Sequence, residues 1–326
     1  MRGFWSTLPR PIRILAPMED VTDHVFRDLT ATLGGPDVFF TEFILADAVA
    51  GVNSGAGPSL PGRLRRGRLD HPLVAQIWGT KPETYRAAAE NLRRLGFDGV
   101  DINMGCPIRK IRKRGACSQL IANPGLAAEL ILAAKEGAGE LPVSVKTRIG
   151  LDRPITEEWC GFLLEQGIDV LTVHGRTADE MSEGRARWEE IRRVVRLRDA
   201  GSYRTLIVGN GGVRHHGEFL SKARRYGVEG VMVGRGIFED PYIFAGGGRL
   251  RRFRHRSREE KLTLLLHHIR AFESAWERER NYEVLKKFYK VYLTGFEDAE
   301  AIRSRLNETH DFESAEEIVR QAVDSS

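Results

Sequence analysis

Two glycine-rich segments, each following a short apolar run, contain the residue types that bind phosphate. They are Gly209-Asn210-Gly211-Gly212 and Gly234-Arg235-Gly236. Glycines let backbone N–H groups approach a bound anion, and Arg235 can add a charge-assisted hydrogen bond. One such segment alone is typical of a tight turn, whereas two of them with an arginine predict a phosphate-bearing cofactor.

Lys146 and His174 stand at the ends of two further apolar runs. A cation beside the N1–C2 region of a flavin stabilises the reduced, anionic ring, which would give Lys146 a part in cofactor chemistry. Taken singly, a surface lysine and a hydrogen-bonded core histidine are the alternatives. Polar residues follow almost every apolar run, however, and that concentration is a stronger signal than any one of them.

The elements that would position these residues are short strands alternating with longer amphipathic stretches. The runs show little polar alternation, as expected for strands buried on both faces. Eight strand–helix units predict an α/β fold, a (β/α)8 TIM barrel, whose active site lies at the C-terminal ends of the strands. The predicted strands are Ile12–Ala16, Val38–Glu42, Leu73–Ile77, Gly99–Asn103, Val143–Thr147, Val170–His174, Thr205–Gly209 and Gly230–Gly234.

The pattern changes after residue 245, where glycines and an arginine-rich segment lead into purely helical periodicity. The capping-box pattern occurs at Ser257 and again at Ser314. We interpret an aromatic stripe over Tyr282 to Tyr292 as core rather than as a platform for base stacking. These features predict a barrel domain over residues 1–245 and a C-terminal all-helical bundle over residues 246–326.

Length and composition exclude several classes of protein. The 326 residues fit a barrel of about 250 residues with a small appendage. The absence of a long uncharged apolar run and of a secretory pattern predicts a cytoplasmic protein without membrane contact. Three cysteines, Cys106, Cys117 and Cys160, do not form a disulfide framework, and no cysteine or histidine pair has zinc spacing. We therefore expect no metal.

The segment Asn103-Met104-Gly105-Cys106-Pro107 resembles the signature of the tRNA-dihydrouridine synthase family. Further motifs between about Ile14 and Phe244 match that family in order. Each is modest alone, but their order makes the resemblance specific. The matching motifs include Ala16-Pro17-Met18, Gln76 with Gly79, Val145 to Gly150, His174 to Thr177, Gly209 to Gly212 and Val233 to Gly236.

The resemblance implies an FMN-dependent enzyme that reduces the C5=C6 bond of specific uridines in tRNA to 5,6-dihydrouridine. NADPH would be the reductant, Cys106 the catalytic proton donor, and the helical domain would help to hold tRNA. The flavin-binding residues that it implies are Ala16, Pro17, Met18, Gln76, Lys146, His174, Asn210, Gly211, Gly212, Gly234 and Arg235. The expected substrate-binding residues are Asn103, Arg148, Arg176, Arg109 and Lys110.

A cysteine suits the proton-donor role. After hydride adds at C6 of the uracil, C5 needs a proton, and a thiol with an ordinary pKa of about 8.5 is mostly protonated at pH 7. The basic run Arg109 to Arg114 would lower the pKa of Cys106 if it pointed at the thiol. Where the family usually has glycines and small residues, this chain has Gly115-Ala116-Cys117-Ser118. We expect Cys117 to be a packing residue, with a reactive role left open.

A uracil in folded RNA must leave its stack to enter a barrel. Three arginine-rich segments could hold the RNA backbone: Arg63 to Arg68, Arg109 to Arg114 and Arg249 to Arg258. A solvated surface explains each one alone, but together with a buried reaction centre they predict RNA binding that weakens as salt rises. We expect tRNA as the partner and a monomeric protein.

Two other functions remain open. An FMN barrel acting on a free pyrimidine, as a dihydroorotate dehydrogenase does, would explain the phosphate loops and Lys146 but not the basic helical tail. A barrel that binds RNA without catalysis would stay colourless when FMN is added. The sequence specifies neither the uridine that is reduced nor a choice between NADPH and NADH.

Overall fold

The computed structural model of the chain describes residues 3–52, 62–246, 252–276 and 279–325. The chain divides into two compact units. The first comprises Met1–His24, Pro36–Val213 and Gly217–Gly234. The second comprises Val25–Gly35, Arg214–His216 and Arg235–Ser326.

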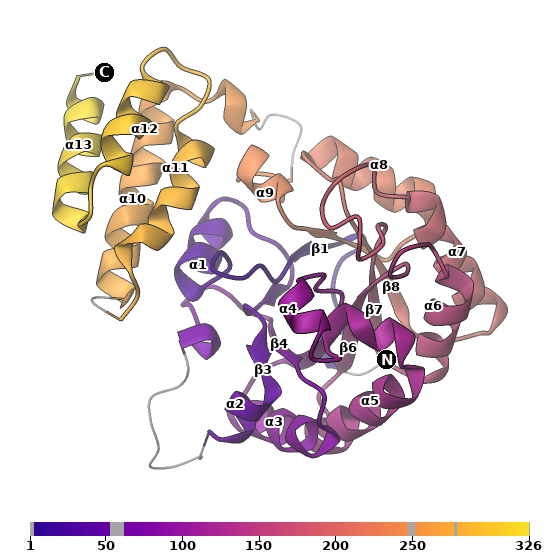
Figure 1. Cartoon of the computed structure of the whole chain (residues 1–326). Coiled ribbons are helices and arrows are strands. Elements are labelled where there is room, and N and C mark those ends of the chain that lie inside the picture. The colour runs from indigo at the N-terminus through magenta and orange to yellow at the C-terminus, as the bar shows by residue number, and fades with distance from the viewer. Residues whose placement is uncertain (1–2, 53–61, 247–251, 277–278, 326) are drawn as a thin grey trace. The chain divides into compact units, whose positions relative to one another are not determined.

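The first unit is a parallel (β/α)8 barrel, which confirms the predicted fold class (Figure 1). Its strands follow the order β1-β9-β8-β7-β6-β5-β4-β2, and β3 extends the sheet by pairing with β4. A parallel bridge between Ile14, in the first strand of this series, and Val38, directly before the last strand, closes the barrel. The strands are β1 (Ile12–Leu15), β2 (Phe39–Phe40), β3 (Ile44–Leu45), β4 (Leu73–Trp78), β5 (Gly99–Met104), β6 (Val143–Arg148), β7 (Val170–His174), β8 (Leu206–Asn210) and β9 (Gly230–Val233).

Helices surround these strands (Figure 1). Their amphipathic sequences bury one side against the sheet, as in α3, where Tyr85 and Leu92 are fully buried. Trp5 belongs to a cluster of residues that begin the strands, including Ile12 and Val170, so it fills the N-terminal end of the barrel. The helices are α2 (Ala46–Ala50), α3 (Pro82–Arg94), α4 (Arg109–Arg112), α5 (Pro124–Ala138), α6 (Thr156–Glu165), α7 (Trp188–Ala200) and α8 (His216–Tyr226).

The second unit is helical and has an aromatic core. Tyr282, Phe288 and Tyr292 are buried, which confirms the interpretation of the aromatic stripe as core. Buried His268 packs edge-on against Phe288, and its Nδ1 lies 2.9 Å from the hydroxyl of Tyr292. The helices are α1 (His24–Thr32), α9 (Gly236–Glu239), α10 (Arg258–Trp276), α11 (Lys286–Tyr292), α12 (Ala299–Asn307) and α13 (Phe312–Asp324).

The two predicted helix caps have different outcomes. At Ser257 the reciprocal capping box is present, because its N–H donates to Glu260 Oε2 and its hydroxyl accepts from the Glu260 N–H. At Ser314 the prediction is wrong, because the helix begins earlier and Asp311 is its cap. The carboxylate of Asp311 accepts from the Ser314 N–H at 2.7 Å. Within the described part of the chain, no helix is long and apolar enough to cross a membrane.

Candidate functional site

The polar residues predicted at the strand ends lie on neighbouring strands of the barrel. Asn103 of β5 pairs in register with Lys146 of β6, and His174 of β7 pairs with Asn210 of β8. Parallel strands share their C-terminal edge, so the register brings these side chains to one end of the barrel. That end lies opposite Trp5.

A chain of buried hydrogen bonds connects β6, β5 and β4 beneath this end. Ser144 Oγ donates to Asp101 Oδ1 at 2.5 Å, and Gln76 Nε2 donates to Asp101 Oδ2 at 2.7 Å. Asn103 Nδ2 donates in turn to Gln76 Oε1 at 2.9 Å. Asp101, Ser144 and Gln76 are almost entirely buried, so these bonds form away from water.

This chain of hydrogen bonds ends on the backbone of the Cys106 loop, and the donors there fix the direction of every bond in it. Asn103 Oδ1 accepts from the N–H of Gly105 at 3.0 Å and from the N–H of Cys106 at 2.9 Å. Because a backbone N–H can only donate, the Asn103 oxygen must face the loop and its NH2 must face Gln76. The Gln76 NH2 must then face Asp101. An acceptor is therefore required at Asp101, which a carboxylate supplies.

Charge and burial oppose each other at Asp101 and Lys146. Burial raises the pKa of Asp101 to about 6, against the hydrogen bonds from Ser144 and Gln76 and the charge of Lys146. Burial also lowers the pKa of Lys146 to about 8, and the neighbouring guanidinium of Arg148 lowers it further. The negative charges of Asp101 and Cys106 act in the opposite direction on Lys146.

The partly buried thiol of Cys106 interacts with a second thiol, that of Cys117, whose neighbour Ser118 donates to the Cys106 carbonyl at 2.8 Å. The hydrogen bond from Cys117 lowers the pKa of Cys106 to about 7, ahead of the opposing effect of burial. Arg148 and Lys146 lower it as well. The expectation of an ordinary thiol pKa is therefore wrong, and the cause is Cys117 rather than the basic run Arg109 to Arg114. The pKa of Cys117 is raised well above its ordinary value by burial and by Cys106.

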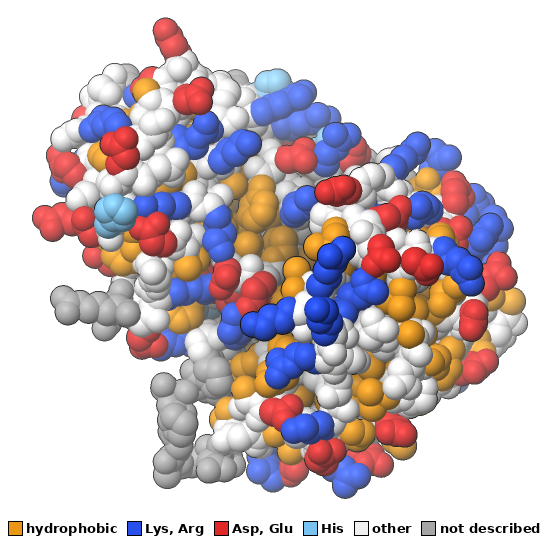
Figure 2. All heavy atoms as spheres, in the orientation of Figure 1, with side chains coloured by type: hydrophobic (Ala, Val, Ile, Leu, Met, Phe, Trp, Pro, Cys, Tyr) orange, Lys and Arg blue, Asp and Glu red, His pale blue; other side chains and the backbone are white. Residues whose placement is uncertain are grey.

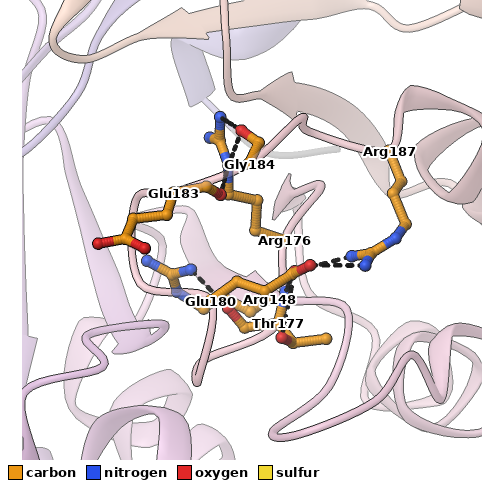
Figure 3. A network of polar contacts seen from close by, with 7 residues as sticks. All are labelled: Arg148, Arg176, Thr177, Glu180, Glu183, Gly184 and Arg187. Atoms are coloured by element: carbon orange, nitrogen blue, oxygen red, sulfur yellow. Dashed lines mark hydrogen bonds and ion pairs between the residues drawn. The ribbon is translucent and has the colours of Figure 1, made fainter.

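Two of the predicted substrate-binding arginines hold backbone carbonyl groups (Figure 3). Arg148 Nε donates to the carbonyl of Gly105 at 2.7 Å, and its Nη1 donates to the carbonyl of Thr177 at 2.8 Å. The buried Arg148 thus ties the Cys106 loop to the loop after β7. Arg176 donates to the carbonyl groups of Glu183 and Gly184 within that second loop.

A carboxylate organises the same β7–α7 loop (Figure 3). Arg187 forms a bidentate pair with Glu180, at 2.7 and 2.5 Å, and the Thr177 N–H donates to Glu180 Oε2 at 2.8 Å. The pKa of Glu180 falls to about 2, chiefly through the Arg187 hydrogen bond. The loop is therefore held by charge-assisted bonds from both of its ends.

The ring of His174 has a defined tautomer. Arg176 Nη1 lies 3.1 Å from His174 Nε2, and a guanidinium can only donate, so Nε2 is the acceptor and the ring is neutral with its proton on Nδ1. Gly211 lies against the same ring, with φ +117°. A Cβ at Gly211 would lie 2.8 Å from His174 Cδ2, so both the backbone and the contact require glycine.

In the glycine-rich loops of the predicted phosphate site, Gly212 and Gly234 have no close contact at the position that a Cβ would occupy. Gly212 also has a positive φ, +63°, and Asn210 Nδ2 holds the carbonyl of Met232 on the neighbouring strand at 2.8 Å. A Cβ built on Gly234 would lie 3.7 Å from both Ala16 Cβ and Met18 Sδ. Pro17 sits between these two residues, and the exposed Arg235 begins the next part of the chain in the second unit.

Among the described residues of the three arginine-rich segments, those around α4 include the most exposed charges. Arg109 and Lys110 are exposed, and Figure 2 shows Lys and Arg side chains gathered over α4. Within the described residues, neither forms a salt bridge. In the other segments Arg63 pairs with Glu19 and Arg258 pairs with Asp298, while residues 249–251 lie outside the described residues.

The sequence assigns no role to Asp101 or Ser144. It also does not predict the interaction between Cys106 and Cys117. Asp101 could have been found from strand periodicity, because it lies two residues before Asn103 and so shares its face. The other two depend on register and on loop geometry. The described residues contain no group of three or more His, Cys, Asp or Glu side chains that could hold a metal ion.

Comparison with known proteins identifies the family. The family model described as "Dihydrouridine synthase (Dus)" matches residues 14–326. A "Probable tRNA-dihydrouridine synthase" of Staphylococcus epidermidis is 42% identical over 322 residues, covering 97% of this chain and 95% of the relative. A "Probable tRNA-dihydrouridine synthase 2" of Bacillus subtilis is 44% identical over 308 residues, covering 94% of this chain and 92% of the relative.

A solved structure supports the barrel fold alone. Histamine dehydrogenase from Rhizobium sp. 4-9 matches with a TM-score of 0.52 and 12% identity, covering 79% of this chain and 48% of that chain. The sequence relatives and the family model, by contrast, span almost the whole chain. The chain belongs to the dihydrouridine synthase family.

Proposed function

We propose that the protein reduces the C5=C6 bond of a uracil in tRNA, with FMN as its cofactor and NADPH as the reductant. Family membership and the names of the relatives support this activity. The observation that carries the proposal is the directed hydrogen-bond chain from Asp101 to the backbone of Cys106. It fixes a thiol loop beside Lys146 at the C-terminal end of a barrel, where such enzymes act. A protein that acts on tRNA is expected in the cytoplasm.

The residues at this end fit a flavin. Lys146 would place a cation near the ring, and Gln76 and His174 would contact the ring and the ribityl chain. The glycines of the β8 and β9 loops leave room for a phosphate, and Asn210 and Arg235 would complete that side. Ala16, Pro17 and Met18 would contact the flavin beside Gly234. When bound and reduced, FMN supplies the hydride for C6 of the uracil.

Cys106 would give its S–H proton to C5 of the uracil. A pKa of about 7 leaves much of the thiol protonated at neutral pH, so the donor form is available. Asn103 would orient the Cys106 loop and lie beside the base. Arg148 would act as a positioning residue, because it holds the carbonyl of Gly105 directly before Cys106.

We propose that residues 1–245 carry the reaction and that residues 246–326 help to hold tRNA. Arg109 and Lys110 would contact RNA phosphates close to the catalytic loop. Arg176 would act on the substrate through the loop that it stabilises. Recognition would depend mainly on RNA shape, since the described surface presents no evident base-reading motif.

The test is a reconstituted assay. Purified protein is loaded with FMN and given NADPH and unmodified tRNA, and dihydrouridine is mapped by mass spectrometry. We expect product with the wild type and almost none with Cys106→Ala, which should still bind flavin. A wild-type rate in Cys106→Ala would remove the assigned role. Reduction of free uracil but not tRNA would favour a free-pyrimidine reductase, and failure to take up FMN would favour a non-catalytic RNA-binding protein.

A further inference from the structure

Cys117 occupies an unusual position for a cysteine. It begins the 3₁₀ turn Cys117–Ala122 with φ +54°, a left-handed conformation that residues other than glycine rarely adopt. Its side chain is fully buried. A buried thiol in a conformation that favours glycine calls for an explanation beyond filling space.

The backbone around Cys117 is fastened to Cys106. The N–H of Ser118 donates to the carbonyl of Cys106 at 3.3 Å, and the Ser118 hydroxyl donates to the same oxygen at 2.8 Å. These bonds hold the two cysteines together although ten residues separate them in the chain. The two side chains also interact, since each thiol shifts the pKa of the other. A disulfide requires two cysteines that are close neighbours in the fold, with Cα atoms about 4.4–6.8 Å apart.

The two thiols differ in access to solvent. Cys106 is partly exposed, whereas Cys117 and the third cysteine, Cys160 of α6, are fully buried. A small oxidant in water therefore meets Cys106 first. Cys117 is then the neighbouring thiol that can attack the oxidised sulfur, and Cys160 lies on a different element.

We propose that Cys106 and Cys117 form a site of reversible oxidation by hydrogen peroxide. The thiolate of Cys106 attacks the peroxide, so that an S–O bond forms, the O–O bond breaks and hydroxide leaves. The sulfur of Cys117 then attacks the sulfenic acid, an S–S bond forms and water leaves. In total two thiols lose two hydrogen atoms, and one peroxide becomes two water molecules.

The disulfide would protect Cys106 from further oxidation. A sulfenic acid without a neighbouring thiol proceeds to sulfinic and sulfonic acids, which ordinary thiol reductants do not reverse. The proposal does not depend on the proposed function, because it concerns the thiols themselves and is read by mass. If the function is as proposed, the oxidised protein is also inactive until it is reduced.

The sequence makes the test direct. Five basic residues lie between the two cysteines, so trypsin places Cys106 in the peptide Leu95–Arg109 and Cys117 in the peptide Gly115–Lys135. The protein is treated with hydrogen peroxide, its free thiols are blocked, and the digest is analysed without reduction. We expect these two peptides to be joined, and dithiothreitol to separate them. Cys106 oxidised to sulfinic acid with no joined peptide would overturn the proposal.

Two variants sharpen the result. Cys117→Gly suits the left-handed backbone and removes the second thiol, so Cys106 should proceed to the irreversible acids and dithiothreitol should no longer restore it. Cys117→Ser also removes the second thiol and should give the same result. Cys160→Ser, a matched buried cysteine, should still give the joined peptide. Full recovery of Cys106 in Cys117→Gly, or a joined peptide containing Cys160, would contradict the assignment.

Discussion

Asn103 accepts a hydrogen bond from the backbone N–H of Cys106 at 2.9 Å, so a side chain of β5 sets the start of the loop that carries the thiol. Asn103 is itself held by Gln76, and Gln76 by Asp101. The position of Cys106 therefore depends on a carboxylate that lies well below it in the barrel. Because each residue of this hydrogen-bond chain has a fixed donor and acceptor, the effect of replacing one of them can be predicted.

Asp101→Asn should be tolerated, whereas Asp101→Ala should not. An asparagine can accept from Gln76 through its oxygen and donate to Ser144 through its nitrogen. Alanine leaves the Gln76 NH2 and the Ser144 hydroxyl without their acceptor, at a cost of about 1–3 kcal/mol for a buried polar group. Urea unfolding of the two variants measures the difference. If asparagine destabilises the protein as much as alanine does, the charge of Asp101 matters rather than its hydrogen bonds.

Removing Cys117 should make Cys106 less acidic. The wild-type pKa of about 7 owes most to the hydrogen bond from Cys117, so in Cys117→Gly the pKa of Cys106 should move up toward the ordinary thiol range. The pH dependence of alkylation by iodoacetamide measures this, since Cys106 is partly exposed whereas Cys117 and Cys160 are buried. Cys160→Ser is the control and should leave the midpoint near 7. An unchanged midpoint in Cys117→Gly would assign the low pKa to Arg148 and Lys146.

The same titration sets the pH dependence of the proposed reaction. Below a pKa of about 7 the S–H form predominates and can donate a proton, and above it the thiolate cannot. Under single-turnover conditions the rate should therefore fall as pH rises through 7. In Cys117→Gly the fall should begin at higher pH. A rate that rises through this range would argue against a proton donor at residue 106.

Arg148→Lys should impair catalysis although lysine keeps the positive charge. A lysine cannot hold the carbonyl groups of Gly105 and Thr177 with the fixed geometry of a guanidinium. Misplacement of a reacting group by about 1 Å can cost on the order of a hundredfold in rate. We expect a lower kcat with a smaller change in KM. Arg86→Lys, at the exposed pair with Glu136, is the matched control and should remain near the wild-type rate.

Arg109→Ala and Lys110→Ala should each weaken tRNA binding in a salt-dependent way. Loss of one phosphate contact lowers the slope of log Kd against log salt by about one. Binding is measured by filter retention over a series of potassium chloride concentrations. The control is Arg86→Ala, on α3, where Arg86 forms an exposed pair with Glu136 of α5; it should leave the slope unchanged. Equal slopes in all variants would place the RNA elsewhere.

His268 should make the protein sensitive to acid. Burial lowers the folded-state pKa of this ring to about 3, whereas an unfolded histidine titrates near 6.5. Between these values the unfolded chain binds the proton and the folded chain does not. Stability is thus fully present above pH 6.5 and is lost as pH falls toward 3, by up to about 1.4 kcal/mol per pH unit. Urea unfolding should show this slope flattened in His268→Gln and kept in the control His255→Gln, which replaces an exposed histidine of the same unit.

The sequence predicted the barrel closely because a buried parallel strand is a local signal. Each of the eight predicted runs contains or overlaps a strand, with bounds that differ by a few residues at most. The strand β2 is shorter than predicted, because only Phe39–Phe40 pairs regularly. The strand β3 has two residues and is too short to show a hydrophobic pattern in the sequence. Helix caps are harder to predict, as Asp311 shows, because several polar residues near a helix start compete for the role.

The site was predicted less completely because its chemistry depends on register. Nothing local reveals that Gln76 faces Asp101, since 25 residues separate them and adjacent strands bring them together. The pKa of Cys106 likewise depends on Cys117, which belongs to a separate 3₁₀ turn, Cys117–Ala122. Residue types and their order predict which strand ends matter. Tertiary pairing decides which of those side chains touch each other.

The one-way order of donors and acceptors from Cys106 to Asp101 also bears on how the protein ages. Hydrolysis of the Asn103 side-chain amide would convert that residue to aspartate. Its new carboxylate could still accept from the Cys106 loop but would turn a second oxygen toward Gln76 Oε1, so that two acceptors would face each other in a dry interior. Spontaneous deamidation at this one position would therefore disturb the Cys106 loop without any change in the gene.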